Sequence, residues 1–230
     1  MFSHRSETQR TAWVRLASSL AAAALTVLLS ILYGPLLLLQ VCGPMKLWPA
    51  IIFFQQPTTV SDLIIPQSIL DDMVAHAREL DPYECCGLLA GANGTVTHVY
   101  RIKNIVALEG AEKLSSFDPA KVAHLERLSP AERAEIAFVM DMQDFSVAKK
   151  DIRNKGLDLQ VVYHSHPHDP ARPSTTDIKI ATDYEEIWPK INLPIPAYLL
   201  ISLMDKSKPD IRGYWITGGT VTQAHITTLA

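Results

Sequence analysis

The sequence is poor in cysteine and contains no cluster of basic residues. Its three cysteines, Cys42, Cys85 and Cys86, are too few for a framework of disulfides, so we expect the adjacent pair to be small buried side chains in a reduced compartment. The 21 lysines and arginines nearly balance the 24 aspartates and glutamates, which gives a net charge of −3. Because basic residues form no block and do not interleave with aromatic residues, we expect no nucleic-acid partner.

Internal repeats and low-complexity tracts are also absent from the sequence. Its 230 residues are 48% hydrophobic, which is enough to bury one substantial core. Segments with helical and strand periodicity follow one another along the chain, and this order indicates a single α/β domain. Helices are predicted at 67–80, 118–128, 143–155 and 174–184, and strands at 83–91, 96–99, 101–106, 136–140, 157–163, 198–203, 210–216 and 220–226.

One stretch, from His164 to Asp177, concentrates residues that bind metal ions. The apolar run at 159–163 predicts a buried strand that leads into this stretch. If the strand continues through His164 and His166, the alternation of side chains places both imidazoles on one face. The two histidines could then bind one ion together.

The rest of this stretch predicts a carboxylate that returns toward the histidine pair. Pro167, Pro170 and Pro173 end the strand and prevent an early helix, so a helix can begin only at Ser174, which is a favourable N-cap. Asp177 lies one helical turn later and can point back to the end of the strand. Two neutral imidazoles and one carboxylate would leave a bound Zn²⁺ with a residual positive charge and an open fourth position, as in catalytic zinc sites.

The full pattern, H-x-H-P-x(6)-S-x-x-D, resembles that of the JAMM metalloproteases, the catalytically competent members of the MPN-domain superfamily. The pattern is complete at His164, His166, Ser174 and Asp177. The resemblance implies a single MPN-type domain of the α/β class, with a mixed β-sheet flanked by helices as in cytidine deaminases. It also implies one Zn²⁺ per chain, bound by His164, His166 and Asp177, and a hydrogen bond from Ser174 to the developing oxyanion.

A further element of the same family lies upstream, at Glu84. The run from Pro82 to Leu89 resembles the P-x-E-x-C-G-L-L context in which JAMM enzymes carry a glutamate that binds the water on the zinc ion. The resemblance implies that Glu84 takes a proton from this water and returns it to the leaving nitrogen. We therefore expect Glu84 and Ser174 to be the catalytic residues.

The resemblance implies hydrolysis of a peptide or isopeptide bond, at the C-terminal Gly-Gly of a ubiquitin-like or sulfur-carrier protein. The alternative is a non-catalytic MPN scaffold module that binds partner proteins, although such modules generally lack the metal ligands. A zinc nucleoside deaminase is disfavoured because it requires H-x-E with P-C-x-x-C, and the two late cysteines are adjacent here. His168 follows Pro167 and is expected to point to solvent rather than to bind the ion.

Residues 107–135 resemble the family least and are interpreted as an insertion into the domain at 58–230. The segment is irregular, with Glu109-Gly110 and Ser115-Ser116 typical of loops. We favour a solvated excursion here over a loop that determines substrate specificity.

The N-terminal segment, 1–57, contains a hydrophobic stretch at 16–45 that carries no formal charge. This stretch is long enough to span a membrane, and by the positive-inside rule Arg5, Arg10 and Arg15 would keep the N-terminus in the cytoplasm. A single span would then export the catalytic domain. A cleaved signal peptide, a hairpin at Gly34-Pro35 and a translation start at Met45 are the alternatives. We favour a cytoplasmic catalytic domain, with 16–42 as a candidate for membrane association.

Overall fold

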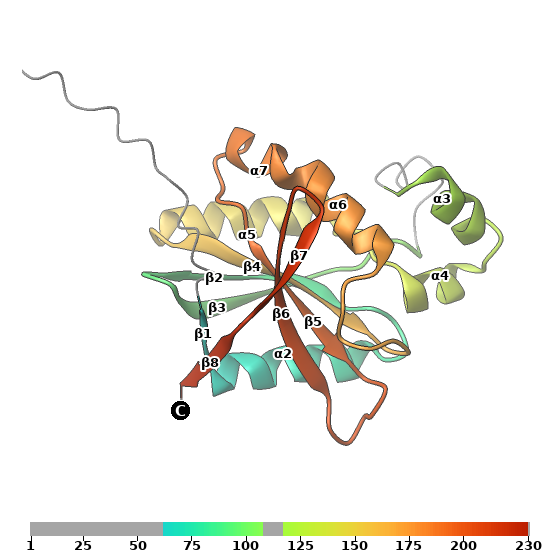
Figure 1. Ribbon diagram of the computed structural model, residues 1–230, viewed down its shortest axis with the longest axis horizontal. Coiled ribbons are helices and arrows are strands. Elements are labelled where there is room, and N and C mark those ends of the chain that lie inside the picture. The colour runs from blue at the N-terminus through green and yellow to red at the C-terminus, as the bar shows by residue number, and fades with distance from the viewer. Residues whose placement is uncertain (1–61, 108–116, 230) are drawn as a thin grey trace, which may run out of the picture. The chain divides into compact units, whose positions relative to one another are not determined.

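The computed structural model of the protein describes residues 62–107 and 117–229 (Figure 1). The hydrophobic stretch at 16–45 and part of the predicted insertion lie outside the described residues. Over the described ranges, no helix is both long and apolar enough to cross a membrane.

The described residues build one mixed β-sheet of eight strands, in the order β7-β6-β5-β4-β2-β3-β1-β8. Strand β4 lies in the middle, antiparallel to β2 and parallel to β5. Only His225 separates β7 from β8 along the chain, so the sheet must curl to bring its two edges together. The strands are β1 (Leu63–Pro66), β2 (Cys86–Ala92), β3 (Thr95–Ile102), β4 (Asp158–His166), β5 (Ala197–Ser202), β6 (Asp210–Thr217), β7 (Thr220–Ala224) and β8 (Ile226–Leu229).

Helices cover both faces of this sheet (Figure 1). Helix α2 (Gln67–Leu80) packs on one face, where Leu70, Met73 and Ala77 join one hydrophobic core. Helices α5 (Met142–Asn154), α6 (Thr175–Glu185) and α7 (Ile187–Lys190) cover the other face and a second core. Two short helices, α3 (Pro119–Leu125) and α4 (Pro130–Ile136), lie beyond one end of α6.

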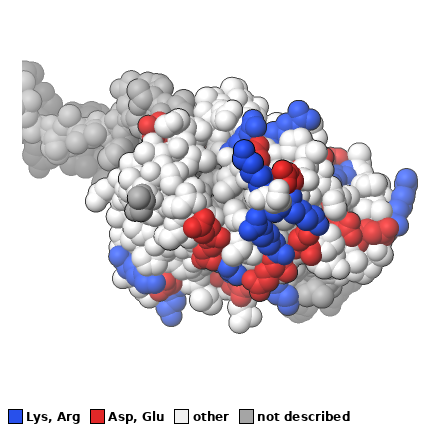
Figure 2. Space-filling view, turned by 90° about the horizontal axis from the view of Figure 1, so that it is seen from below, with Lys and Arg blue, Asp and Glu red and all other residues white. Residues whose placement is uncertain are grey.

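The outer surface of α2 carries charges of both signs. Figure 2 shows acidic and basic side chains interleaved on the side of the molecule seen from below. Arg101 of β3 pairs with two acidic side chains of α2, with its guanidinium 2.5 Å from Asp72 and 2.8 Å from Glu79. These exposed pairs join the helix to the sheet but contribute little to the free energy of unfolding, roughly 0–1 kcal/mol each.

Alternation along β4 decides which side chains reach the functional end of the sheet. Val161 and Tyr163 belong to the core under α2, whereas Val162 belongs to the core under α5 and α6. His164 and His166 follow Val162 at the same parity, so both imidazoles point to the α6 side.

The predicted α/β class and mixed sheet are confirmed, as is the helix at 67–80. The predicted strand at 136–140 is wrong. Helix α4 runs to Ile136, and the following residues make only an isolated bridge between Met140 and Asn104. The capping box of Ser129 and Glu132 explains the difference, because it begins a helix whose last turn occupies the start of the apolar run. The predicted strand at 220–226 is two strands, β7 and β8.

The described part of the predicted insertion is not a solvated excursion. Phe117, Leu125, Ala134 and Ala137 are buried in a third small hydrophobic core, together with Val106. Ile180 of α6 packs against this core, so the segment is attached to the helix that carries Asp177. The structure therefore corrects our interpretation of residues 117–135.

Candidate active site

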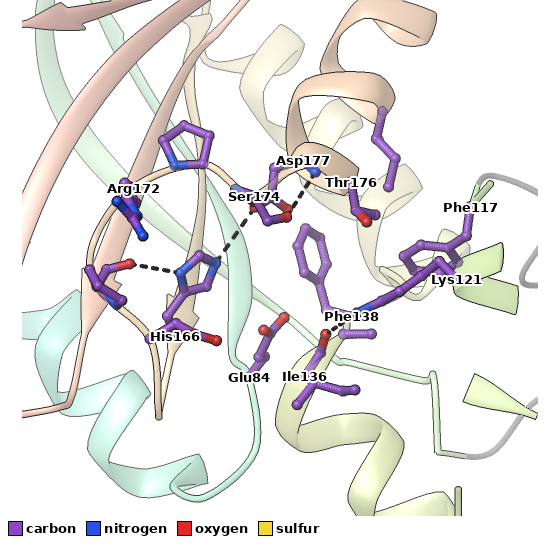
Figure 3. A pocket seen from close by; sticks show the side chains of 15 residues that line it. Glu84, Phe117, Lys121, Ile136, Phe138, His166, Arg172, Ser174, Thr176 and Asp177 are labelled. Atoms are coloured by element: carbon purple, nitrogen blue, oxygen red, sulfur yellow. Dashed lines mark hydrogen bonds and ion pairs between the residues drawn. The ribbon is translucent and has the colours of Figure 1, made fainter. Parts of the chain in front are cut away.

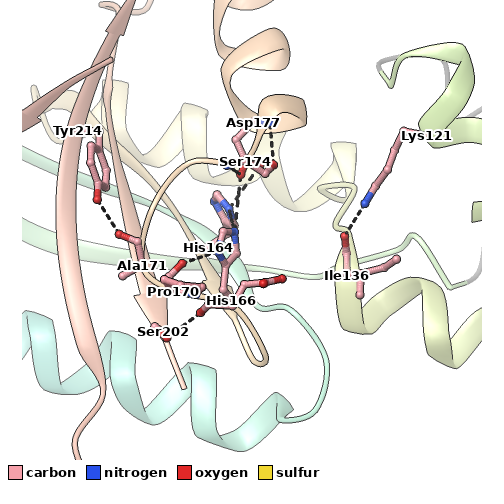
Figure 4. Close-up of polar contacts among 11 residues, drawn as sticks. Lys121, Ile136, His164, His166, Pro170, Ala171, Ser174, Asp177, Ser202 and Tyr214 are labelled. Atoms are coloured by element: carbon pink, nitrogen blue, oxygen red, sulfur yellow. Dashed lines mark hydrogen bonds and ion pairs between the residues drawn. The ribbon is translucent and has the colours of Figure 1, made fainter. Parts of the chain in front are cut away.

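Two histidines at the end of β4 form the base of the site. His164 and His166 are buried, and their Nε2 atoms lie 3.0 Å apart (Figure 4). Backbone hydrogen bonds hold the strand on both sides: the Ser165 N–H donates to the Cys85 carbonyl oxygen, and the Leu203 N–H donates to the His166 carbonyl oxygen. The Ser165 hydroxyl also accepts from the Cys85 N–H at 2.8 Å. Neighbouring strands thus fix the separation of the two imidazoles.

The N-terminus of α6 brings a carboxylate to the same point. Ser174 and Asp177 form a capping box, in which the Ser174 N–H donates to Asp177 Oδ2 at 2.7 Å and the Asp177 N–H donates to Ser174 Oγ at 3.2 Å. This orientation places Asp177 Oδ1 3.5 Å from His164 Nε2 and Asp177 Oδ2 3.6 Å from His166 Nε2. The predicted cap at Ser174 is confirmed, and its partner in the capping box, Asp177, faces both imidazoles.

The arrangement of these three residues fits a bound cation. His166 Nδ1 donates to the Pro170 carbonyl oxygen at 3.0 Å, which leaves the Nε2 lone pair of a neutral imidazole directed at His164 and Asp177. The candidate ligand atoms of His164, His166 and Asp177 all lie within 4.8 Å of one another. Among the described residues, this is the one such group of metal-binding side chains. Three protein ligands would leave a position open for water or substrate.

The electrostatics of the group also suit a positive charge. Burial lowers the pKa of His166, but the hydrogen bond to Asp177 and the nearby Glu84 together raise it to about 9. Burial raises the pKa of Asp177, but the charges and hydrogen bonds of His164 and His166 hold it well below its ordinary value. In the absence of a metal ion, a proton on the His166 imidazole would supply part of the charge that a cation supplies when it is bound.

Glu84 lies in the same pocket as His166, Ser174 and Asp177, just before β2 (Figure 3). Its side chain is buried, and this burial raises the pKa of the carboxyl to about 8 against the opposing charge of His166. A carboxyl with such a pKa is suited to take up and release protons near neutral pH. The pocket has a volume of about 380 Å³ and is lined by Glu84, Phe117, Lys121, Ile136, Ala137, Phe138, His166, Asp169, Pro170, Arg172, Pro173, Ser174, Thr176, Asp177 and Ile180.

Asn104 holds the backbone of Glu84 in place, and no sequence pattern singles out this residue. Its Nδ2 donates to the carbonyl oxygens of Glu84 at 3.0 Å and of Ala137 at 3.1 Å. Its Oδ1 accepts from the N–H groups of Val106 and Val139, each at 3.1 Å. The side chain therefore ties the Glu84 segment to the segment that follows α4.

The described part of the predicted insertion forms one wall of this pocket. Phe117 and Lys121 line it, next to Ile136 and Phe138 from the residues that follow, and the ring centroid of Phe138 lies 4.7 Å from that of His164. These contacts join residues far apart in the sequence, which is why the spacing of residues around His164 could not predict them.

Among the described residues, the other histidines, Cys85 and Cys86 do not join the metal group. His168 is half exposed and pairs with Glu135 at 3.4 Å, which agrees with the expectation that it points away from the ion. Cys85 and Cys86 are buried as expected and free of disulfides. Burial raises the pKa of Cys85 to about 12 and that of Cys86 well above its ordinary value, so neither thiol is suited to act as a nucleophile.

Comparisons with known proteins show which proteins this chain is similar to. The family described as prokaryotic homologs of the JAB domain matches residues 66–216. The chain is similar to a CysO-cysteine peptidase of Mycobacterium tuberculosis, with 31% identity over 165 residues, which cover 72% of this chain and 90% of the relative. It is also similar to a probable TtuB-protein conjugate cleaving protease of Thermus thermophilus, with 30% identity over 119 residues, which cover 52% of this chain and 63% of that relative.

A solved structure gives the same result for the fold. The solution structure of protein DSY2949 from Desulfitobacterium hafniense superposes with a TM-score of 0.50 at 29% identity, covering 72% of this chain and 92% of that one. The family match extends over well more than half of the chain and includes Glu84, both metal-site histidines and Asp177. The chain therefore belongs to the Prok-JAB family, the prokaryotic homologs of the JAB domain.

Proposed function

We propose that this chain is a zinc-dependent peptidase, which hydrolyses a peptide or isopeptide bond at the C-terminal Gly-Gly of a ubiquitin-like or sulfur-carrier protein. One observation carries the proposal: a buried carboxyl, Glu84, lines the same pocket as His166 and Asp177, two of the three residues in the candidate metal group. A structural metal site needs no such neighbour, whereas hydrolysis needs a group that moves protons beside the metal.

The names of the similar proteins support the substrate class. The mycobacterial relative is named for a bond between CysO and cysteine, and the Thermus relative for conjugates of TtuB with proteins. Both names describe cleavage between a named protein and an amino acid or a second protein. We extend this class of reaction to the present chain.

Zinc is proposed because of the donor set. Two imidazole nitrogens and one carboxylate oxygen, with a fourth position left open, are typical of catalytic zinc sites. When bound, zinc would polarise the scissile carbonyl and increase the acidity of water in the site. Glu84 would take a proton from the attacking water and pass it to the leaving nitrogen. The Ser174 hydroxyl would hydrogen-bond the carbonyl oxygen as it gains negative charge.

The pocket wall has a role in this mechanism as well. Phe117, Ile136 and Phe138 give the pocket that contains Glu84 an apolar wall, which would limit the access of water and strengthen charge interactions inside the pocket. Pro170 accepts the Nδ1 hydrogen of His166 and so keeps its Nε2 available as a ligand.

The experiment compares the wild-type chain with Glu84→Gln on a panel of bacterial sulfur-carrier proteins that end in Gly-Gly and are extended by one alanine. Intact mass measures release of the alanine, and elemental analysis measures zinc. We expect wild-type turnover that a chelator abolishes, and a loss of about 10²–10⁴-fold in Glu84→Gln with zinc still bound. Full activity of Glu84→Gln would remove Glu84 as the base, and chelator-insensitive hydrolysis would remove the metal.

The same experiment separates the second candidate, a non-catalytic scaffold module. Such a module would bind carriers without cleaving them, whether or not zinc is present. Zinc-loaded wild-type protein that binds several carriers and releases alanine from none would favour the scaffold.

A further inference from the structure

Lys121 places a positive charge in the pocket wall that the described part of the predicted insertion forms. The residue projects from α3 and lines the pocket beside Phe117, Ile136 and Phe138 (Figure 3). Its Nζ donates one hydrogen bond, to the Ile136 carbonyl oxygen at 3.1 Å, and within the described ranges it makes no ion pair. An ammonium group has three N–H donors, so Lys121 keeps donors for a ligand.

The local structure holds Lys121 in this position. The Asp118 side chain caps α3 and accepts from the Lys121 N–H at 2.9 Å. Leu125 and Phe117, on either side of Lys121 in sequence, are buried in the small core that also contains Ala134. The Arg133 Nε donates to the carbonyl oxygen of Leu125 at 2.8 Å and thereby joins α4 to the end of α3. The lysine therefore extends from a packed element.

The position of Lys121 relative to Glu84 indicates which part of the substrate Lys121 contacts. Figure 3 places Glu84 between His166 and the Lys121 ammonium, and the positive charge of Lys121 acts on the Glu84 carboxyl. In the proposed function Glu84 delivers a proton to the leaving nitrogen. A residue on the far side of Glu84 from the metal ligands, such as Lys121, therefore lies on the leaving-group side of the site. Arg172 also lines the pocket, but Figure 3 draws it on the opposite side of His166.

We propose that Lys121 binds the α-carboxylate of the leaving group, so that the site selects carriers bearing a single C-terminal amino acid. This inference rests on the proposed function and specifies its substrate. In a free amino acid the amine and the carboxylate share one carbon atom, so a leaving nitrogen at Glu84 brings the carboxylate toward Lys121. The apolar wall strengthens this ion pair. A carrier joined to a lysine side chain of a folded protein has no carboxylate at this position and is a poorer substrate.

The test uses a sulfur-carrier protein that ends in Gly-Gly and carries one further alanine, either as the free carboxylate or as the carboxamide. We measure kcat/KM for both forms with the zinc-loaded enzyme, and their dissociation constants in the Glu84→Gln background, where turnover does not obscure binding. The wild type should prefer the carboxylate by about tenfold or more, the effect of one charge-assisted hydrogen bond. Lys121→Met should lower kcat/KM for the carboxylate form only, and so remove this preference.

Three further variants make the result specific. Lys121→Gln keeps a donor for the Ile136 carbonyl oxygen and should lose the preference, whereas Lys121→Arg should retain most of it. Lys190→Met removes the same charge from an exposed position on helix α7 and should leave kcat/KM unchanged for both substrate forms. Thermal unfolding of each variant confirms that it is folded.

Each other outcome has a defined meaning. A carboxylate preference that survives in both Lys121→Met and Lys121→Gln would overturn the inference. An equal loss of rate for both forms in Lys121→Met would also overturn it, because that loss indicates a structural role. A preference that disappears in Arg172→Met but not in the Lys121 variants would overturn it as well. If the wild type neither binds nor cleaves either form, the proposed function fails and the inference fails with it; if it binds and cleaves both equally, the inference alone fails.

Discussion

The side-chain amide of Asn104 donates a hydrogen bond of 3.0 Å to the backbone carbonyl oxygen of Glu84. Asn104 lies just beyond β3, whereas Glu84 precedes β2, so this bond fixes the candidate base relative to the neighbouring strand. The same amide donates to Ala137, and its oxygen accepts from Val106 and Val139. All four hydrogen-bonding positions that an asparagine side chain commonly uses are therefore occupied here.

Replacing Asn104 by alanine should loosen Glu84 without touching the metal ligands. We expect a loss of about 2–4 kcal/mol in the free energy of unfolding, because the bonded backbone groups are left unsatisfied in a partly buried region. Turnover should fall while zinc content stays the same. Denaturant unfolding, kcat and elemental analysis measure the three effects. Asn154→Ala, at the exposed end of α5, is the matched control, and a kcat unchanged in Asn104→Ala would contradict the positioning role.

Zinc should stabilise the wild-type chain, and this stabilisation should depend on Asp177. A ligand at a hundredfold excess over its dissociation constant adds about 2.7 kcal/mol to the free energy of unfolding if it binds only the folded state. Asp177→Asn keeps an oxygen that can accept from the Ser174 N–H but removes the charged ligand, so most of the zinc-dependent shift in Tm should disappear. Asp183→Asn, on the exposed side of the same helix, should keep the full shift. Equal shifts in both variants would argue against Asp177 as a ligand.

Two serines in this chain cap helices in the same way, and only one of them lines the pocket. Ser174 caps α6 and Ser129 caps α4, each within a capping box. Replacing either by alanine should cost about 1 kcal/mol of stability. Only Ser174→Ala should also reduce kcat, because Ser174 alone faces the substrate position. Urea unfolding and steady-state kinetics on both variants separate capping from catalysis, and parallel losses of kcat would assign the effect to stability.

Local spacing was enough to predict that His164, His166 and Asp177 lie together. Strand alternation fixes His164 and His166 on one face, and the three prolines delay the helix until Ser174, whose cap orients Asp177. Each step depends on neighbours within a few residues. The proximity of Glu84 to this group is a contact between distant segments, and it was predicted only because the surrounding residues resemble a family motif.

Contacts between residues far apart in the sequence could not be predicted from local patterns. Asn104 looks like an ordinary polar residue at the end of a strand, and only the fold reveals that it joins Glu84 to Ala137. Lys121 likewise lies on a short helix, α3, whose packing depends on Ile180 of a helix far along the chain. The apolar run at 136–140 has the composition of a strand, but α4 uses its first residue and leaves too little chain to pair.

Stability should fall in mild acid because of a buried pair on the α2 face of the sheet. His76 Nδ1 lies 2.9 Å from the Tyr163 hydroxyl, and both side chains are buried. Burial holds the pKa of Tyr163 far above its usual range, so this hydroxyl donates and His76 accepts as a neutral imidazole. Burial, and then the charge of Arg101, lower the pKa of His76 to about 4, against Glu79 and Asp72, which raise it.

The sign of the pH effect follows from this shift, and His76→Gln tests it. Between the ordinary histidine pKa of 6.5 and about 4, the unfolded chain binds a proton at His76 that the folded chain does not, so the free energy of unfolding falls as pH falls through this window. Glutamine can accept from Tyr163 but does not titrate, so the difference in stability between pH 7 and pH 5 should be smaller in His76→Gln than in the wild type. Urea unfolding of the metal-free protein at both pH values measures it, with His124→Gln at an exposed position as the control. An unchanged difference in His76→Gln would show that other groups cause the acid sensitivity.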